Sequence, residues 1–290
     1  MATTLKPMLS VIHQPHELQA LLNERKRQGA SIGFVPTMGA LHDGHASLIE
    51  KSWNENDVTV CSIFVNPTQF NNPDDFLHYP KTIEQDTQLL QEAGCDYLFL
   101  PTSETMYPTG TPRTRFDFGA LETVMEGAFR AGHFNGVGII VSKLLHLVQP
   151  DKAYFGLKDL QQYLVVKQLV ADLGFPVQII GCPIIRDEDG LAMSSRNKRL
   201  TATQRAIAPL LYKALQKAES LLATKDFGQI QEEVAALLAT EPSFKLEYFE
   251  IADGQTLESI KHYSPEKSIA LCIAAFLGDV RLIDNILIEK

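Results

Sequence analysis

The first 180 residues alternate short apolar runs with amphipathic stretches, and this alternation constrains the fold more than any other feature. Residues 58–65 (VTVCSIFV) are β-branched and almost wholly apolar, as expected of a strand that is covered on both faces. Residues 81–93 have helical spacing and stop at Gly94, a residue type that often follows helix ends. Strands that alternate with helices in this way predict right-handed βαβ units. We therefore expect an α/β fold: a Rossmann-like parallel sheet with helices on both faces.

The remaining elements follow from the same patterns. In the first part of the chain we expect further strands at residues 32–35, 97–100, 153–155 and 177–181, and helices at residues 45–56, 137–148 and 160–173. After about residue 184 a polar loop precedes helical segments at 202–223 and 227–238 and strand-like runs at 246–251, 269–275 and 282–287. This change predicts a Rossmann-like domain of residues 1–183 and a smaller C-terminal α+β domain of residues 184–290, which we expect to act as a lid.

Composition and charge narrow the class of protein. The net charge of −9 argues against a nucleic-acid partner, which requires clustered Lys and Arg. No run approaches the roughly 20 apolar residues of a membrane helix, and the N-terminus lacks the apolar core of a secretory signal. The four cysteines have no metal-ligand spacing, and Cys61 and Cys272 lie in apolar runs typical of buried thiols. We therefore expect a cytoplasmic protein with no membrane partner.

The most informative segment is residues 33–50 (GFVPTMGALHDGHASLIE), in which a buried strand leads through a glycine-containing turn into a helix. Ligands of open parallel sheets bind beyond the carboxyl ends of the strands, where this turn lies. A helix start offers backbone N–H groups and a positive dipole end, both suited to phosphate. His42 and His45 are spaced so that both imidazoles can face one point.

Two other interpretations of this histidine pair stay open. The pair could lie in an ordinary surface turn. It could also bind a metal ion with His78 or His133 as a third ligand, although no Asp or Cys cluster accompanies them. The segment matches neither the dinucleotide fingerprint nor the P-loop pattern.

Two further segments carry groups that suit phosphate oxygens. Residues 154–169 place Lys158 between a strand and a helix, again at the carboxyl edge of the sheet. In residues 186–200 (RDEDGLAMSSRNKRL), Ser194 and Ser195 supply two hydroxyl groups and the adjacent Arg196 supplies a guanidinium. Each segment alone could be an ordinary solvated surface, but the three together favour a nucleoside triphosphate as ligand.

The motifs together resemble one known family. HDGH and MSSR resemble the paired motifs of the nucleotidylyltransferase superfamily. PTMGALHDGH, FVNPTQF, GHFNGV, FGLKDLQQ and GLAMSSRN, in this order, look like the pantothenate synthetase (pantoate–β-alanine ligase) family over residues 8–289. The resemblance implies condensation of pantoate with β-alanine, with ATP as cosubstrate, Mg²⁺ as cofactor, a bound pantoyl adenylate and a cytoplasmic homodimer.

The resemblance also implies roles for individual residues. It implies an ATP site formed by Met38, Gly39, Ala40, Leu41, His42, Asp43, Gly44, His45, Gly156, Leu157, Lys158, Asp159, Ile185, Met193, Ser194, Ser195 and Arg196. Within this set the catalytic groups would be His45, His42, Lys158, Ser194, Ser195 and Arg196. Pantoate would contact Gln69, Gln162 and Asn66, and Asp86 would contribute to Mg²⁺ binding.

The sequence departs from the family at one place and leaves other functions open. The family usually has Glu and Tyr where this chain has Leu157 and Leu160, so side-chain contacts from these positions are in doubt. A nucleotidyltransferase of the same superfamily, acting on a phosphate-bearing small molecule, is the main alternative. A catalytically silent nucleotide sensor is another.

Overall fold

Contacts divide the computed structural model, which describes residues 8–71 and 76–289, into two compact units. Unit 1 comprises Met1–Phe118, Arg130–Leu157 and Val165–Pro183. Unit 2 comprises Gly119–Phe129, Lys158–Leu164 and Ile184–Lys290. Two short segments that precede residue 184 therefore belong to unit 2.

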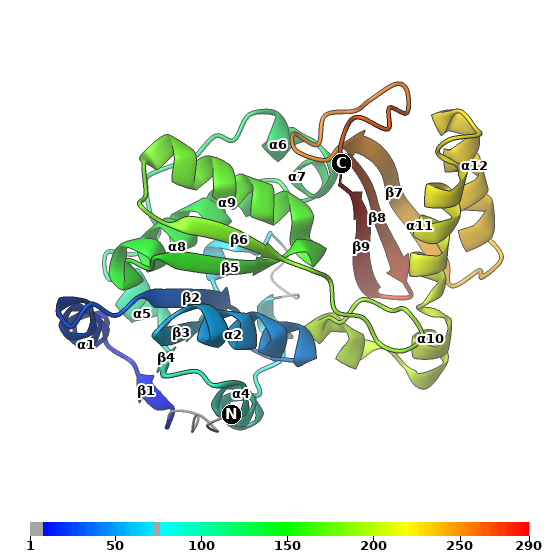
Figure 1. Cartoon of the computed structure of the whole chain (residues 1–290). Coiled ribbons are helices and arrows are strands. Elements are labelled where there is room, and N and C mark those ends of the chain that lie inside the picture. The colour runs from blue at the N-terminus through cyan, green and yellow to red at the C-terminus, as the bar shows by residue number, and fades with distance from the viewer. Residues whose placement is uncertain (1–7, 72–75, 290) are drawn as a thin grey trace, which may run out of the picture. The chain divides into compact units, whose positions relative to one another are not determined.

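Unit 1 is built on one parallel sheet, which has six strands among the described residues, in the order β1-β4-β3-β2-β5-β6. The strands are β1 (Ser10–Ile12), β2 (Ile32–Thr37), β3 (Val58–Ile63), β4 (Tyr97–Phe99), β5 (Lys152–Gly156) and β6 (Gln178–Cys182). Helices α8 (His133–Val148) and α9 (Leu160–Leu173) lie on one face, and α2 (Asp43–Glu55) and α4 (Ile83–Ala93) on the other (Figure 1). Helix α1 (Pro15–Arg27) packs against α8. The expected parallel α/β sheet is confirmed.

The strand order of unit 1 reverses direction between β2 and β5. From β2 the chain continues to β3 and β4 on one side, and later to β5 and β6 on the other. Such a switch point is where open α/β sheets bind ligands, beyond the carboxyl ends of the strands. The turn after β2 contains His42, and the corner after β5 begins at Leu157.

Unit 2 contains a separate antiparallel sheet with the order β7-β8-β9. Its strands are β7 (Phe244–Asp253), β8 (Ile269–Leu277) and β9 (Val280–Ile288). Helix α11 (Leu210–Leu221) packs on β8 and β9, and α12 (Phe227–Leu238) packs on β7 (Figure 1). Leu215, Ile230 and Ile273 are fully buried in the core between these layers. This small α+β module agrees with the expected architecture.

Several elements differ from those expected. The single helix expected at 202–223 is wrong: α10 (Ala202–Ile207) ends before Pro209, which precedes α11, because proline cannot donate the helical hydrogen bond. Strand β2 continues through Pro36, since its pairing with β5 ends at Phe34 and no ladder bond is lost there. Elements not expected are β1, α1, the short helices α5 (Ser103–Met106), α6 (Ala120–Thr123) and α7 (Met125–Phe129), and the 3₁₀ turns η1 (Pro67–Gln69), η2 (Leu157–Asp159) and η3 (Ser195–Arg199).

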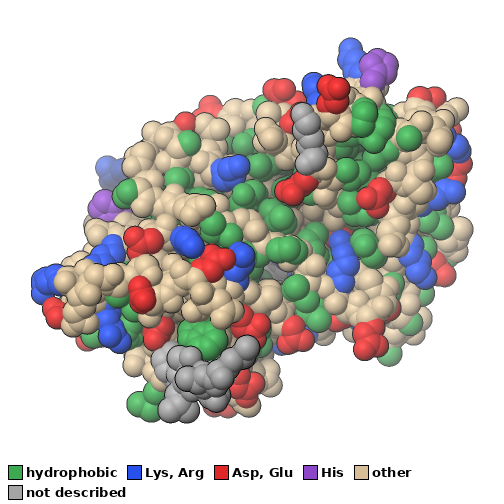
Figure 2. Space-filling view, in the orientation of Figure 1, with side chains coloured by type: hydrophobic (Ala, Val, Ile, Leu, Met, Phe, Trp, Pro, Cys, Tyr) green, Lys and Arg blue, Asp and Glu red, His purple; other side chains and the backbone are tan. Residues whose placement is uncertain are grey.

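Surface charge and the length of the apolar helices are the features that relate to nucleic acid and to membranes as partners. On the face drawn in Figure 2, acidic and basic side chains are interspersed. None of the helices in the described part of the chain is long and apolar enough to span a membrane.

Candidate active site

The histidine turn follows β2 directly and starts helix α2. His42 is the N-cap of α2, with extended backbone (φ −150°, ψ 176°), and its Nδ1 accepts a 3.2 Å hydrogen bond from the N–H of Gly44. His45 lies in the first helical turn, with its ring centroid 4.2 Å from that of His42. The two rings are tilted by 52° and both are half-buried. The spacing of the two histidines therefore brings their imidazoles together, as expected.

The cap fixes which nitrogen of His42 carries a proton. A main-chain N–H can only donate, so Nδ1 of His42 must be the acceptor in this bond. The neutral ring then carries its proton on Nε2, which can donate to an anionic oxygen. The positive end of the α2 dipole adds to the attraction for such an anion.

The backbone amides of this turn already have partners. The N–H groups of Ala40 and Leu41 donate to Asp86, that of Gly44 donates to Nδ1 of His42, and that of His45 donates to the His42 carbonyl. At the helix start itself, the N–H groups of Gly44 and His45 are therefore engaged within the turn, so the expectation of open N–H groups is wrong for these two residues. The imidazoles of His42 and His45 are side-chain groups of the same turn that can donate to phosphate oxygens.

Asp86 holds the turn from helix α4. Its side chain is buried, with 1% exposed, and accepts from Ala40 (2.9 Å), Leu41 (2.8 Å) and the hydroxyl of Thr82 (2.9 Å). Ala40 has a positive φ of 51°, a strained conformation for a residue with a Cβ. Because both carboxylate oxygens are engaged, Asp86 fits a positioning role better than Mg²⁺ binding. Its role in Mg²⁺ binding stays a prediction.

Asn66 and Gln69 lie in the 3₁₀ turn after β3, and both are buried. The Asn66 amide donates to Gln69 Oε1 (3.1 Å) and to the Gly136 carbonyl (3.1 Å), and its Oδ1 accepts from the hydroxyl of Tyr107 (2.7 Å). Gln69 Nε2 donates to the sulfur of Met38 at 2.8 Å. The structure thus brings Gln69 to the histidine turn, and Asn66 orients Gln69 rather than presenting an open amide.

Two residues of the GHFNGV motif support this turn, and the sequence assigned them no such role. His133 Nδ1 donates to the carbonyl of Gln69 at 2.8 Å, which is not the metal-binding role considered above. A Cβ on Gly136 would lie 2.3 Å from the carbonyl oxygen of Thr68, so only glycine lets α8 approach the turn that contains Gln69.

Among the described residues, no three His, Cys, Asp or Glu side chains are grouped as a metal site would require.

A cavity of about 710 Å³ in unit 1 adjoins the same turn. Gln69, Tyr107, Arg115, His133 and Asn135 are among the residues that line it. Its lining combines Arg115 with the acidic Glu104 and with polar and apolar side chains.

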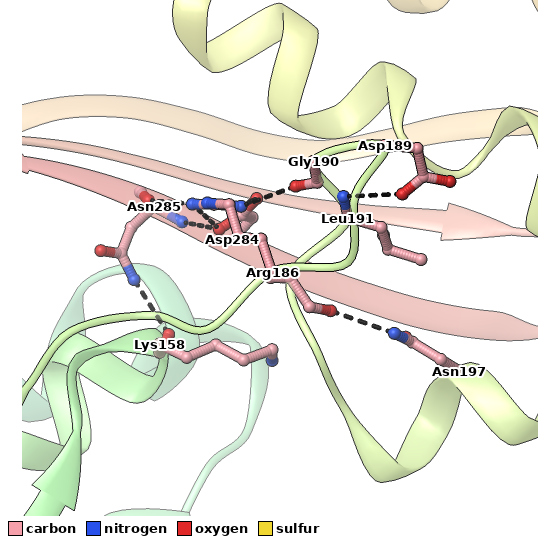
Figure 3. A network of polar contacts seen from close by, with 9 residues as sticks. Lys158, Arg186, Asp189, Gly190, Leu191, Asn197, Asp284 and Asn285 are labelled. Carbon is pink, nitrogen blue, oxygen red and sulfur yellow. Dashed lines mark hydrogen bonds and ion pairs between the residues drawn. The ribbon is translucent and has the colours of Figure 1, made fainter. Parts of the chain in front are cut away.

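The Lys158 corner is held within unit 2. The carbonyl of Lys158 accepts a 2.9 Å hydrogen bond from Nδ2 of Asn285 on β9 (Figure 3). In the following helix, Gln161 is buried and donates to the carbonyls of Leu121 (2.7 Å) and Val124 (2.9 Å). Gln162 is half-buried in the same helical turn. Of the two neighbouring glutamines, Gln161 thus has a structural role, and the predicted pantoate contact falls to Gln162.

The serine loop, residues 186–197, is held at its base by Arg186. The guanidinium forms a bidentate pair with Asp284 (2.7 and 3.0 Å), donates to the Gly190 carbonyl (3.1 Å) and lies 3.7 Å from the Tyr212 ring centroid. A Cβ on Gly190, whose φ is 93°, would lie 2.7 Å from the Tyr212 ring. These contacts anchor the base of the serine loop.

The phosphate-suited residues lie at the far end of the serine loop. Met193 N donates to the Ile185 carbonyl (3.0 Å), and Ser194 Oγ accepts from the N–H of Arg196 (3.3 Å). Ser195 is buried, and Arg196 is half-buried. This hydrogen bond places Ile185 beside Met193, and their contact with ATP stays a prediction.

Comparison with known proteins identifies the family. The model of the family described as pantoate-beta-alanine ligase matches residues 10–287. The chain belongs to this family. Curated pantothenate synthetases of Bacteroides fragilis and Cytophaga hutchinsonii are 50% and 51% identical to it. The first alignment covers 96% of this chain and 98% of the relative, and the second covers 94% and 96%.

Solved structures of pantoate–β-alanine ligases have the same fold. A pantothenate synthetase from Thermus thermophilus superposes with a TM-score of 0.88 at 42% identity, covering 95% of this chain and 98% of that chain. The pantoate-beta-alanine ligase from Francisella tularensis, described as complexed with beta-gamma ATP and beta-alanine, gives a TM-score of 0.79 at 37% identity. That match covers 97% of this chain and 98% of that one.

Proposed function

We propose that this ligase-family chain condenses pantoate with β-alanine to give pantothenate, AMP and pyrophosphate through an enzyme-bound pantoyl adenylate. Full-length similarity to pantothenate synthetases supports the reaction. The observation that carries the mechanism is the His42–His45 pair, 4.2 Å apart at the start of α2 and directly beyond β2, which flanks the sheet's switch point.

The first step activates an inert carboxylate. A pantoate carboxylate oxygen attacks the α-phosphorus of ATP, the bond to the bridging oxygen breaks, and pyrophosphate leaves with the electron pair. Both reactants are anions, so charge repulsion dominates the barrier, and fixed donors lower it. We assign this role to His42 and His45 from unit 1 and to Lys158, Ser194, Ser195 and Arg196 from unit 2.

Pantoate binding is assigned to neutral amides. Gln69 and Gln162 can pair with hydroxyl and carboxylate groups without neutralising the nucleophile, whereas a guanidinium would hold the carboxylate more tightly. Asn66 supports this assignment indirectly, because it holds the Gln69 amide oxygen. The remaining ATP contacts are assigned to residues 38–45, Gly156, Leu157, Asp159, Ile185 and Met193, with Ile185 beside the adenine.

The second step forms the amide. The neutral amine of β-alanine attacks the acyl carbon, the bond from that carbon to the phosphate oxygen breaks, and AMP leaves. The proton that the amine loses passes to a phosphate oxygen of the departing AMP. Water must be excluded because it would hydrolyse the adenylate. We propose that the C-terminal module provides this exclusion as a lid.

We propose only that Mg²⁺ binds together with ATP, through the phosphate oxygens. When bound, it neutralises charge on the β- and γ-phosphates, and it is commonly held by substrate oxygens with one or two carboxylates. The engaged carboxylate of Asp86 does not fit such a ligand well. We further propose a homodimer in the cytoplasm, as the family resemblance implies.

Product analysis tests the function. The chain is incubated with ATP, pantoate and β-alanine, and the products are separated by chromatography. We expect equal amounts of pantothenate and AMP, and neither without pantoate. A product that retains the nucleotide would favour the alternative nucleotidyltransferase, and release of ADP would contradict adenylate formation.

A further inference from the structure

One strand of unit 2 contacts both phosphate-suited segments of that unit. Asp284 and Asn285 are neighbours on β9, and both residues are 4% exposed. Successive residues of a strand point to opposite faces of the sheet. Asp284 therefore reaches Arg186 at the base of the serine loop, whereas Asn285 reaches the Lys158 corner on the other side (Figure 3).

Asn285 holds the main chain at Lys158 and not its ammonium group. Nδ2 of Asn285 donates to the Lys158 carbonyl at 2.9 Å, across 127 residues of sequence. Figure 3 shows the Lys158 side chain extending away from this bond. The contact therefore fixes the origin of the side chain and leaves the ammonium group for another partner.

Asp284 and the edge of β9 hold the serine loop. The two carboxylate oxygens of Asp284 accept from both terminal nitrogens of Arg186, and the carbonyl of Asn285 accepts from the same guanidinium at 3.2 Å. Bidentate pairs of this kind fix direction as well as distance. Asp284 also accepts from the N–H of Asn285 (2.7 Å), so the two holding groups are themselves connected.

We propose that Asp284 and Asn285 are positioning residues that hold the Lys158 corner and the serine loop as one preassembled anion-binding surface. The inference rests on the proposed role of Lys158 and Arg196 in binding ATP. Preassembly matters because an unanchored cation would lose side-chain and backbone entropy on each binding event. Neither residue contacts the reacting atoms in this proposal.

A double-mutant cycle on nucleotide binding tests the inference. The full-length chain is titrated with α,β-methylene-ATP in a calorimeter as wild type, Asn285→Ala, Lys158→Ala and the double variant. Loss of one hydrogen bond predicts about fivefold weaker binding for Asn285→Ala. If Asn285 acts through Lys158, the double variant binds less than twofold more weakly than Lys158→Ala alone. A further fivefold loss in the double variant would overturn the proposal.

A second double-mutant cycle, with Asp284→Asn and Arg196→Ala, tests the contact of β9 with the serine loop. The double variant should again bind less than twofold more weakly than Arg196→Ala alone. Asn285→Asp serves as a second variant at the first position, because it keeps the shape and replaces the donor by an acceptor. Asp279→Asn, in the exposed turn before β9, is the matched control and should bind as wild type does. In steady state, Asn285→Ala should raise the KM for ATP and leave the KM for β-alanine unchanged.

The outcomes separate this inference from the proposed function. If Lys158→Ala and Arg196→Ala bind the analogue as tightly as wild type, the assignment of the ATP site itself is wrong. If those two variants weaken binding while Asn285→Ala, Asn285→Asp and Asp284→Asn do not, only the positioning role is overturned.

Discussion

The carboxylate of Asp86 accepts a 2.9 Å hydrogen bond from the main-chain N–H of Ala40, which lies 46 residues earlier in the chain. Ala40 has a positive φ of 51°, so the bond stabilises a backbone conformation that alanine rarely adopts. The turn it holds leads directly to His42. The position of the imidazole pair thus depends on a carboxylate in another helix.

Replacing Asp86 tests this dependence. In Asp86→Asn, an amide NH₂ replaces one of the two acceptor oxygens and faces a main-chain N–H, which is also a donor. We therefore expect the turn to shift and kcat/KM for ATP to fall about tenfold or more. Thr82→Val, which removes only the hydroxyl donor to Asp86, should have a smaller effect. Steady-state kinetics at rising Mg²⁺ concentration provide the measurement. If kcat/KM of Asp86→Asn returned to the wild-type value at high Mg²⁺, the positioning role of Asp86 would be contradicted and a metal-binding role favoured.

Gly136→Ala tests the contact between helix α8 and the Gln69 turn. The new Cβ would lie 2.3 Å from the Thr68 carbonyl, so either the helix or the turn must move. Overpacking of this kind costs about 1–3 kcal/mol in the free energy of unfolding, and we expect a higher KM for pantoate as well. Gly156→Ala meets nothing within 4 Å and serves as the control for stability alone, measured by urea unfolding. Equal midpoints for the two variants would refute the contact.

The buried thiols predict a loss of stability at alkaline pH. Burial raises the pKa of Cys61 to about 12 and that of Cys272 to about 12. Between pH 9 and about 12 the unfolded chain therefore loses thiol protons that the folded chain keeps, so stability falls as pH rises. Each such thiol contributes up to about 1.4 kcal/mol per pH unit in this range.

Cys61→Ala isolates one thiol in this effect. We measure the free energy of unfolding in urea at pH 8.0, 9.5 and 10.5. It should fall less steeply with pH in the variant than in wild type, by about the contribution of one thiol. The comparison of slopes is unaffected by the constant cost of the smaller side chain. Parallel slopes for the two proteins would show that Cys61 is not responsible.

The sequence predicted the parallel sheet and the main motifs because these depend on local patterns. The apolar run at β3 and the HDGH spacing lie within single segments, and α9 and α12 have the bounds expected for them. The contacts that hold the site are not local. Asp86 bonds to a turn 46 residues away, Asn66 to Gly136 across 70 residues, and Asn285 to Lys158 across 127 residues. A single sequence carries no pattern that pairs such residues.

Other expectations failed because a local pattern had more than one structural solution. His42 at the start of a helix predicted open amides, but its own Nδ1 accepts from Gly44. The interval 202–223 has helical spacing throughout, although Pro209 divides it. The buried position of Gln161 against the segment at 121–126 was not predicted, and the pantoate contact of the adjacent Gln162 stays a prediction.

His45→Ala tests the donor assigned to the phosphate. Removal of one preorganised donor costs on the order of 3 kcal/mol in the barrier, so adenylation should slow by about two orders of magnitude. Single-turnover formation of AMP, measured in a rapid-quench apparatus with all three substrates, gives the rate. A change of less than threefold would remove His45 from the catalytic groups.

Isotope exchange tests the two-step route most directly. Wild-type protein is incubated with ATP, labelled pyrophosphate and pantoate, and no β-alanine is added. If the first step makes pantoyl adenylate reversibly, label enters ATP, and the rate falls by about two orders of magnitude in His45→Ala and strongly in Lys158→Ala. If pantothenate forms when all substrates are present but no label enters ATP until β-alanine is added, the adenylate route proposed for this chain is contradicted.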